Sequence, residues 1–116
     1  MIVVITGDRH WVDRNKIYQR LLLLPFDAAV VHGDCPTGAD RIADELAKEM
    51  GFVVVPVPAD WNKYGLSAGP IRNSAMIAMG PWLVIAFHSD INGKSKGTKD
   101  CVNKAKARGI PVEIIT

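Results

Sequence analysis

IVVITG, residues 2–7, opens the chain with five β-branched residues in a row, followed by a glycine. A run this short and free of charge predicts a strand buried on both faces, because the strands of parallel sheets are apolar throughout. A helix is expected next, over residues 13–24, because Pro25 acts as a stop signal. The chain therefore begins with a buried strand and a helix.

The rest of the sequence repeats this alternation. Further strands are expected at residues 28–32 (AAVVH), 52–57 (FVVVPV), 82–87 (WLVIAF) and 112–115 (VEII), and further helices at 37–50, 70–79 and 98–108. Thr37, Pro70 and Thr98 are the helix-start signals, and Pro56 indicates a strand at the sheet edge. The pattern predicts a three-layer, Rossmann-like α/β fold with helices on both faces of a mainly parallel five-stranded sheet. By analogy, the strand order is 3-2-1-4-5.

Length and composition restrict the class of protein. The 116 residues, 48% of them hydrophobic, fit one domain over residues 1–116. A net charge of +2 is too small to indicate nucleic acid or an acidic membrane as partner, so any basic site must be local. The two cysteines lack metal-like spacing, and neither a signal peptide nor a membrane-spanning run is recognisable. We expect a cytoplasmic protein.

Unusual residues concentrate in the segments that follow the strands. These segments read GDRH, GDCPTGAD, PADWNKYGLSAGP and HSDINGKSKGT, whereas the turns at the opposite end of the sheet (LPFDA, EMGF, MGPW and RGIP) are plain. In open α/β sheets, ligands bind beyond the carboxyl ends of the strands, where the strand order reverses. The sequence therefore predicts a ligand crevice at this edge.

Cations at two helix starts indicate the charge of that ligand. Arg72 is expected in the first turn of the helix that Pro70 opens, and Lys96 and Lys99 at the start of the last helix. A cation near a helix N-terminus is unfavourable by roughly 0.3–1 kcal/mol, unless an anion binds there as well. Phosphate is the natural candidate. The alternative is that Arg72 pairs with Asp60 or Asp34 and the lysines are solvated.

Other candidate residues have two readings each. The turn after the first strand, with Gly7, Asp8 and Arg9, is a common first contact for a nucleotide, although neither GxxxxGK[ST] nor GxGxxG is present. Asp40 is either a helix-start residue or a catalyst, and Gly33 and Gly38 are either turn glycines or points where a ligand meets backbone. Trp61 stacks on a base, covers the crevice or packs in the core.

Metal and thiol chemistry are not predicted. The three histidines (His10, His32 and His88) each follow a strand, but no HxH, HExxH or CxxC spacing accompanies them. We therefore expect no metal. Cys35 has no partner in the sequence that would make it a nucleophile, which favours an inert thiol.

Several motifs together resemble a known family. TGDR, HGDCPTGADRIADELAKEMG, VPADWNKYGLSAGPIRNSAMI and SKGTKDCVNKAKARGIPV are similar to the YspA-like, cpYpsA-related group of the SLOG superfamily, small Rossmann-like proteins of bacteria and phages. The resemblance implies a nucleotide or nucleotide-derived ligand. Apart from a bound nucleotide, the sequence indicates no particular cofactor. It also implies a homodimer paired through helices.

Relatives in this superfamily include the LONELY GUY phosphoribohydrolases, whose pattern resembles RKxxM followed by PGGxGTxxE. Arg72 and Met76 fit the first part, and Gly97 and Thr98 fit GT, whereas the catalytic glutamate falls on Cys101, one residue after Asp100. The resemblance implies Arg72 as a catalytic candidate for an N-glycosidase. Such an enzyme also needs a carboxyl group, for which Asp100 is a candidate and Asp8, Asp34 and Asp60 are alternatives.

Three functions follow, in order of preference: nucleotide binding for sensing or sequestration, hydrolysis of a nucleoside monophosphate, and binding of single-stranded nucleic acid. The last is disfavoured by the low aromatic content of 7%. The expected ligand-binding residues are Gly7, Asp8, Arg9, Gly33, Asp34, Gly38, Asp40, Asp60, Trp61, Gly69, Arg72, Asn73, Lys96, Gly97 and Thr98.

Overall fold

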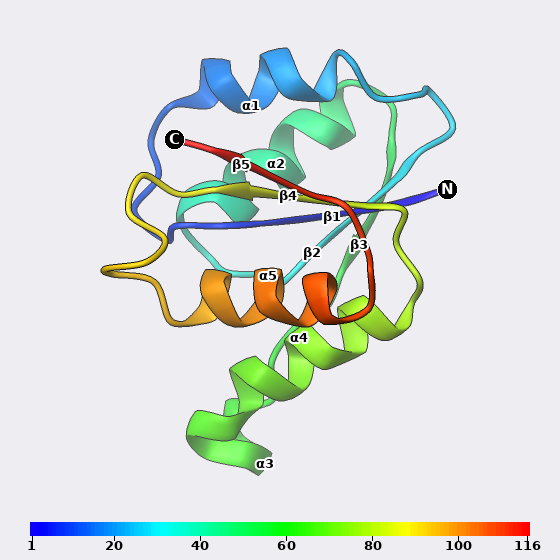
Figure 1. Cartoon of the computed structure of the whole chain (residues 1–116). Helices are drawn as coiled ribbons and strands as arrows, with labels where there is room; N and C mark the ends of the chain where they lie inside the picture. Colours follow the sequence, from blue (N-terminus) through cyan, green and yellow to red (C-terminus); the bar gives the residue numbers. More distant parts are fainter.

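A five-stranded parallel sheet forms the centre of the computed structural model, which describes residues 1–116. Its strands are β1 (Ile2–Gly7), β2 (Ala29–His32), β3 (Val53–Pro56), β4 (Leu83–Phe87) and β5 (Val112–Ile115). The order is β3-β2-β1-β4-β5, and every neighbouring pair is parallel (Figure 1). The predicted Rossmann-like fold and strand order are confirmed, and β3, which ends in Pro56, is an edge strand.

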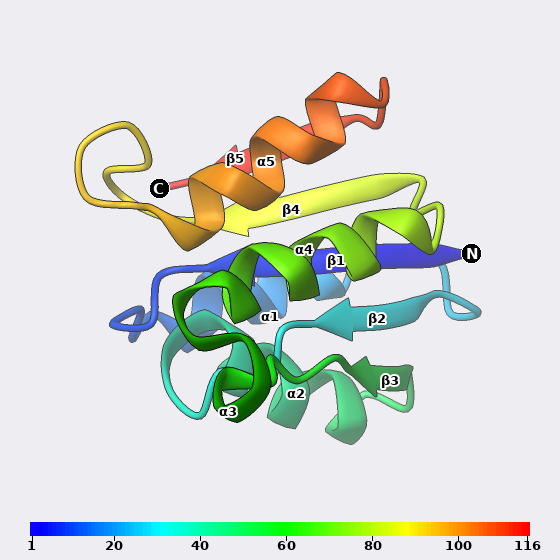
Figure 2. The same ribbon diagram turned by 90° about the horizontal axis from the view of Figure 1, so that it is seen from below.

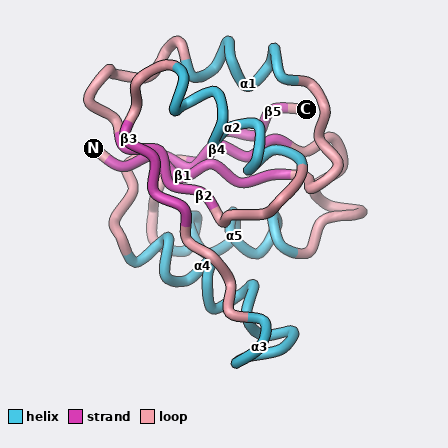
Figure 3. Tube along the Cα trace, turned by 180° about the vertical axis from the view of Figure 1, so that it is seen from behind, coloured by secondary structure: helices cyan, strands magenta, loops and turns pink.

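Helices cover both faces of this sheet. They are α1 (Arg14–Leu21), α2 (Gly38–Glu49), α3 (Trp61–Tyr64), α4 (Ala68–Ala78) and α5 (Gly97–Ala107), with a short 3-10 segment, η1 (Gly65–Ser67), before α4. Figures 1 and 2 show α1 and α2 on one face and α4 and α5 on the other. The short α3 projects from the body of the molecule (Figure 3). None of these helices has the length and apolar character needed to cross a membrane.

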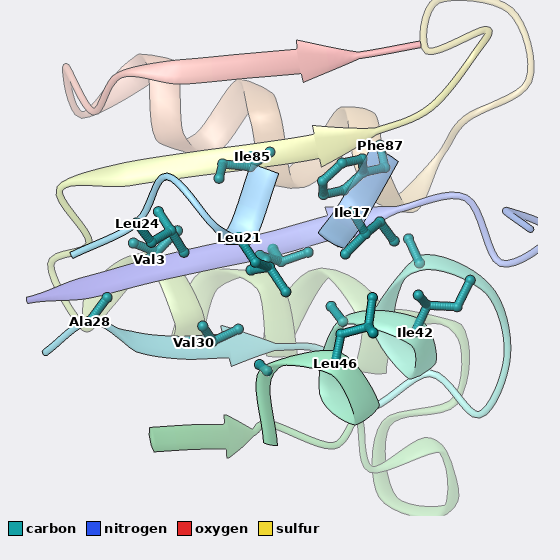
Figure 4. Packing of buried hydrophobic residues seen from close by; sticks show 14 of the residues in the cluster. Val3, Ile17, Leu21, Leu24, Ala28, Val30, Ile42, Leu46, Ile85 and Phe87 are labelled. Carbon is teal, nitrogen blue, oxygen red and sulfur yellow. The ribbon is translucent and has the colours of Figure 1, made fainter. Parts of the chain in front are cut away.

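Two apolar clusters hold the three layers together. On one face, Val3, Ile5 and Ile85 of the sheet pack with Ile17 of α1 and Leu46 of α2 (Figure 4). On the other face, the intervening strand residues pack against α4 and α5. This cluster consists of Val4, Val31 and Val84 of the strands and Met76, Ile77, Cys101 and Ala105 of the helices. Successive strand residues point to opposite faces. The unbroken β-branched runs of the sequence therefore supply both cores.

Helix starts differ from the sequence expectation at three places. The segment 61–67, expected to be irregular, forms α3 and η1, because the Asp60 carboxylate accepts the Lys63 N–H at 3.1 Å and starts a helical turn. Helix α4 begins at Ala68, so the expected start at Pro70 is wrong by two residues. Thr98 is not the cap of α5: the N-cap is Lys96, and the Ser95 hydroxyl accepts the Lys99 N–H at 3.0 Å.

Candidate functional site

A cavity of about 400 Å³ opens at the carboxyl ends of the strands. The loops that follow β1 and β4 and the start of α5 meet at this end of the sheet (Figure 2). This is the point where the strand order reverses, between β1 and β4. One lining residue of the fifteen is hydrophobic; the set is Thr6, Gly7, Asp8, Arg9, His10, Cys35, Asp40, Arg72, Asn73, His88, Lys94, Ser95, Lys96, Gly97 and Thr98.

Positive charge predominates in this lining. Arg9, Arg72, Lys94 and Lys96 contribute cations, whereas Asp8 and Asp40 contribute the carboxyl groups. None of the four cations forms an ion pair with a carboxylate of the chain. The alternative reading, in which Arg72 pairs with Asp60 or Asp34, is therefore wrong. A concave surface lined with one sign of charge favours a ligand of the opposite sign.

Arg72 is fixed by hydrogen bonds that leave part of its guanidinium free. Its Nε donates to Asn73 Oδ1 at 2.8 Å, and its Nη1 donates to the Gly33 carbonyl. A guanidinium has five N–H donors, so others remain for a ligand. Because α4 begins at Ala68, Arg72 lies in the second turn, and the expectation that it sits in the first turn is wrong. The helix N-terminus that brings a cation to the cavity is therefore that of α5, whose N-cap is Lys96.

The first turn of α5 has unused donors. The backbone N–H groups of Gly97 and Thr98 have no acceptor in the protein. A Cβ added at Gly97 would meet no atom within 4 Å, so packing does not explain the glycine. Asn73 fixes this turn, since its Nδ2 donates to the Gly97 carbonyl and to Asp100 Oδ2, both at 3.1 Å. The turn thus presents donors to the cavity on a rigid support.

Asp40 brings an unusual carboxyl group into the same cavity. Its side chain is buried in the first turn of α2, and Oδ2 accepts the Cys35 N–H at 3.3 Å. Burial raises the pKa of the Asp40 carboxyl above its ordinary value of 3.8, while the Cys35 N–H and the charge of Arg72 oppose that rise. A perturbed acid in a cleft is a candidate for function.

Two glycines bring the loop after β1 close to α2. A Cβ on Gly7 would lie 2.6 Å from the Ala39 Cβ, and Gly38, with φ +74°, faces the backbone of Asp8 and Arg9. The Ala39 N–H donates to the Asp8 carbonyl at 3.0 Å. Packing therefore accounts for both glycines, although Gly7 also lines the cavity.

Some expected residues lie outside the cavity. Asp34 has a positive φ of 56°. Gly33 accepts a hydrogen bond from Arg72, Gly38 lies against the loop after β1, and Asp60 caps α3. Trp61 is 55% exposed on α3, so core packing is wrong for it; its ring lies against Gly69, where an added Cβ would be 3.3 Å away. Asp100 pairs with Lys104 at 2.9 Å and does not line the cavity.

Cys101 occupies the position of the phosphoribohydrolase glutamate. Its side chain is fully buried, and burial raises the pKa of the thiol to about 11, whereas the neighbouring Thr6 side chain and the charge of Arg72 lower it. The thiol therefore stays protonated at neutral pH. It supplies neither the charge nor the exposure that a catalytic carboxylate needs.

The structure also adds residues that the sequence interpretation did not select: Thr6, His10, Cys35, His88, Lys94 and Ser95. Most of them belong to the segments that follow β1, β2 and β4, so their position after a strand was the available signal. No group of three or more His, Cys, Asp or Glu side chains is placed to hold a metal ion.

A known protein and a known family are similar to this sequence. Gene 61 protein of Mycobacterium phage D29 is 40% identical over 119 aligned residues, which cover 95% of this chain and 92% of the phage protein. A sequence profile of the YspA, cpYpsA-related SLOG family matches residues 1–64, which include the loop with Asp8 and Arg9 and the start of α2 with Asp40, all at the cavity. The chain belongs to the YspA, cpYpsA-related SLOG family.

Proposed function

We propose that the protein binds a nucleotide or a nucleotide-derived ligand in this cavity, as a sensor or a sequestering protein. The observation that carries the proposal is the set of four unpaired cations beside the free N–H groups of α5. A phosphate group satisfies both kinds of partner, because it accepts hydrogen bonds and carries negative charge. Membership of the SLOG family supports a nucleotide-related role.

Size and polarity agree with a ligand of this class. A volume of about 400 Å³ is at the lower end of the range for small-molecule sites. We assign the phosphate to Lys96, Gly97, Thr98 and Arg72. We assign a hydroxyl group of the ligand to Asp40, a carboxyl group that lines the same cavity and can accept a hydrogen bond.

Calorimetry of the full chain with AMP, ADP-ribose and inorganic phosphate tests the proposal. Arg72→Ala and Lys96→Ala are each expected to weaken the binding of AMP by about 10-fold or more, because a charge-assisted hydrogen bond is lost. Lys99→Ala is the matched control, since Lys99 is exposed on the same helix but does not line the cavity. Equal affinities for the Lys96→Ala and Lys99→Ala variants would contradict the assignment.

Native mass spectrometry of the freshly purified protein is the complementary experiment. A nucleotide retained from the host would identify the base and the number of phosphates. The same spectrum gives the number of subunits, and so tests the homodimer that the family resemblance implies.

A second candidate function, hydrolysis of an N-glycosidic bond, is favoured by the raised pKa of Asp40. In this reaction, water adds its OH to the ribose carbon and a proton goes to the leaving base, so a neutral acid near the base is required. Chromatography of bases released from a nucleotide panel is the test. For an enzyme that uses Asp40, Asp40→Asn should abolish release of the base but retain binding. Asp100→Asn tests the other candidate acid, which lies one residue before the position of the family glutamate.

A further inference from the structure

His88 is a buried histidine at the end of β4 whose surroundings differ from those of a structural histidine. The residue is 5% exposed. Its backbone N–H donates to the Ile115 carbonyl at 2.9 Å, which continues the pairing of β4 with β5. Phe87 packs on the face of α1 and α2. Since strand residues alternate, His88 belongs to the face of α4 and α5, and it lines the cavity together with the first residues of α5.

Hydrogen bonding determines which ring nitrogen of His88 carries the proton. Nδ1 accepts the Asp90 N–H at 2.9 Å, so Nδ1 is unprotonated and the neutral ring carries its hydrogen on Nε2. Nε2 forms no hydrogen bond within the chain. Because no buried side-chain nitrogen or oxygen lacks a partner, Nε2 is open to solvent, and His88 lines the cavity. The ring therefore has one donor left over at a polar wall.

His32 provides an internal comparison. His32 is the last residue of β2, and His88 is the first residue after β4. As in His88, Nδ1 of His32 accepts the backbone N–H of the residue two positions later, here Asp34 at 3.0 Å. Its Nε2, however, lies 2.8 Å from Asp44 Oδ1, so both ring nitrogens are satisfied within the chain. Contacts within the chain therefore account for both ring nitrogens of His32. In His88 they account for Nδ1 but leave the Nε2–H without an acceptor.

We propose that His88 is a further ligand-binding residue, whose Nε2–H donates to an oxygen of the anionic group held at the first turn of α5. Other groups that line the same cavity, the Gly97 and Thr98 N–H groups and the Lys96 ammonium, are donors too. Several free donors in one cavity favour an acceptor-rich occupant, and a phosphate group supplies such acceptors. This inference rests on the proposed nucleotide-binding function and assigns one more contact to its phosphate.

The same ring organises the loop beside the cavity. The Asp90 N–H is held by Nδ1, Asp90 Oδ1 accepts the Gly93 N–H at 3.2 Å, and the Asp90 carbonyl accepts the Lys94 N–H at 3.0 Å. Nδ1 thus supports the loop, whereas Nε2 faces the ligand. Two amide substitutions separate these roles, because Asn retains an acceptor near the position of Nδ1 and Gln retains a donor near that of Nε2.

Calorimetry with the tightest-binding of three probes (AMP, ADP-ribose and inorganic phosphate) tests the inference on the full chain. His88→Asn is expected to bind about 10-fold more weakly than the unmodified protein, with a Tm within about 2 °C of it. His88→Gln is expected to lose stability but to keep more of the affinity than His88→Asn does. Unchanged affinity for His88→Asn would overturn the inference.

NMR of the unmodified protein decides the case even if His88→Asn unfolds. Correlation of the imidazole nitrogens with the ring protons should show the Nε2–H form of His88 before ligand is added. At saturation with the probe, the Nε2 resonance should shift while Nδ1 stays in place; an unmoved Nε2 resonance overturns the inference. Absence of binding by the unmodified protein to all three probes would overturn the proposed function as well.

Discussion

The guanidinium of Arg72 occupies the space that a side chain at Gly33 would need. A Cβ added to Gly33 would lie 2.7 Å from the Arg72 Cζ, and the Gly33 carbonyl accepts a hydrogen bond from Arg72 Nη1. The φ angle of Gly33 is not positive, so the backbone conformation does not require glycine there. The glycine makes room for the cation and thereby sets its position at the wall of the cavity.

Gly33→Ala should therefore act through Arg72. The guanidinium is the mobile end of a flexible side chain, so it can move away from the new methyl group at a cost below about 1 kcal/mol of stability. Its displacement removes a charged donor from the cavity, and we expect AMP to bind about 10-fold more weakly. Calorimetry and urea unfolding of the same variant separate the two effects. Full affinity in Gly33→Ala would show that Arg72 is not held in place by this contact.

Gly97→Ala tests the opposite case, a glycine with open space around it. An added Cβ meets no protein atom within 4 Å, so the free energy of unfolding should stay the same or rise by up to about 1 kcal/mol, because Ala is the better helix former. The methyl group would instead obstruct an anion that approaches the first turn of α5. Weaker AMP binding with unchanged stability is the expected result. If the affinity is unchanged, no ligand comes close to Gly97.

Most of the fold could be predicted from the sequence, because strands that are buried on both faces of a sheet appear as short apolar runs. The runs IVVI of β1 and LVIAF of β4 are unbroken apolar stretches, and nearby prolines and glycines mark turns. Strand order leaves no such local signal, since it depends on how separate strands pair. It was obtained by analogy with other doubly wound sheets.

The candidate site was predictable only in part. Position after a strand brings a residue to the correct rim, but the direction of its side chain depends on where the next helix starts. Helix α4 starts at Ala68 instead of Pro70, which moves Arg72 from the first turn to the second, and α3 holds Trp61 away from the cavity. His32 and His88 have similar sequence positions, and only the fold reveals that Asp44 satisfies one of them.

Asp40→Asn should make stability depend less on pH. The pKa of Asp40 is raised by burial, so below its ordinary value of 3.8 the carboxyl is protonated in both the folded and the unfolded state. As the pH rises through the folded pKa, the buried group ionises against desolvation, and native stability falls. Asn has no such transition and retains an oxygen that can accept the Cys35 N–H.

The stability of Asp40→Asn relative to the unmodified protein should therefore increase between about pH 4 and pH 7. Urea unfolding at several pH values within that range measures the difference, and the remaining titratable groups cancel in the comparison. A relative stability that falls towards neutral pH would mean that the ionised Asp40 is stabilised by its neighbours.

Gly38→Ala, compared with Gly51→Ala, separates strain in the backbone from collision. Both glycines have positive φ, +74° for Gly38 and +87° for Gly51, so each substitution carries a conformational penalty of about 1–2 kcal/mol. Gly51 has no atom within 4 Å of an added Cβ, whereas Gly38 faces the backbone of Asp8 and Arg9, which cannot move as a side chain can. Gly38→Ala should therefore lose more stability than Gly51→Ala, by about 1 kcal/mol or more.

Because the loop after β1 brings Arg9 to the cavity, Gly38→Ala should also weaken AMP binding, whereas Gly51→Ala should not. Urea unfolding and calorimetry on this pair measure the two effects. Equal losses of stability in the two variants would show that the contact between Gly38 and the loop is dispensable. The position of Arg9 would then have to depend on the hydrogen bond that the Thr37 hydroxyl donates to the Arg9 carbonyl at 2.9 Å.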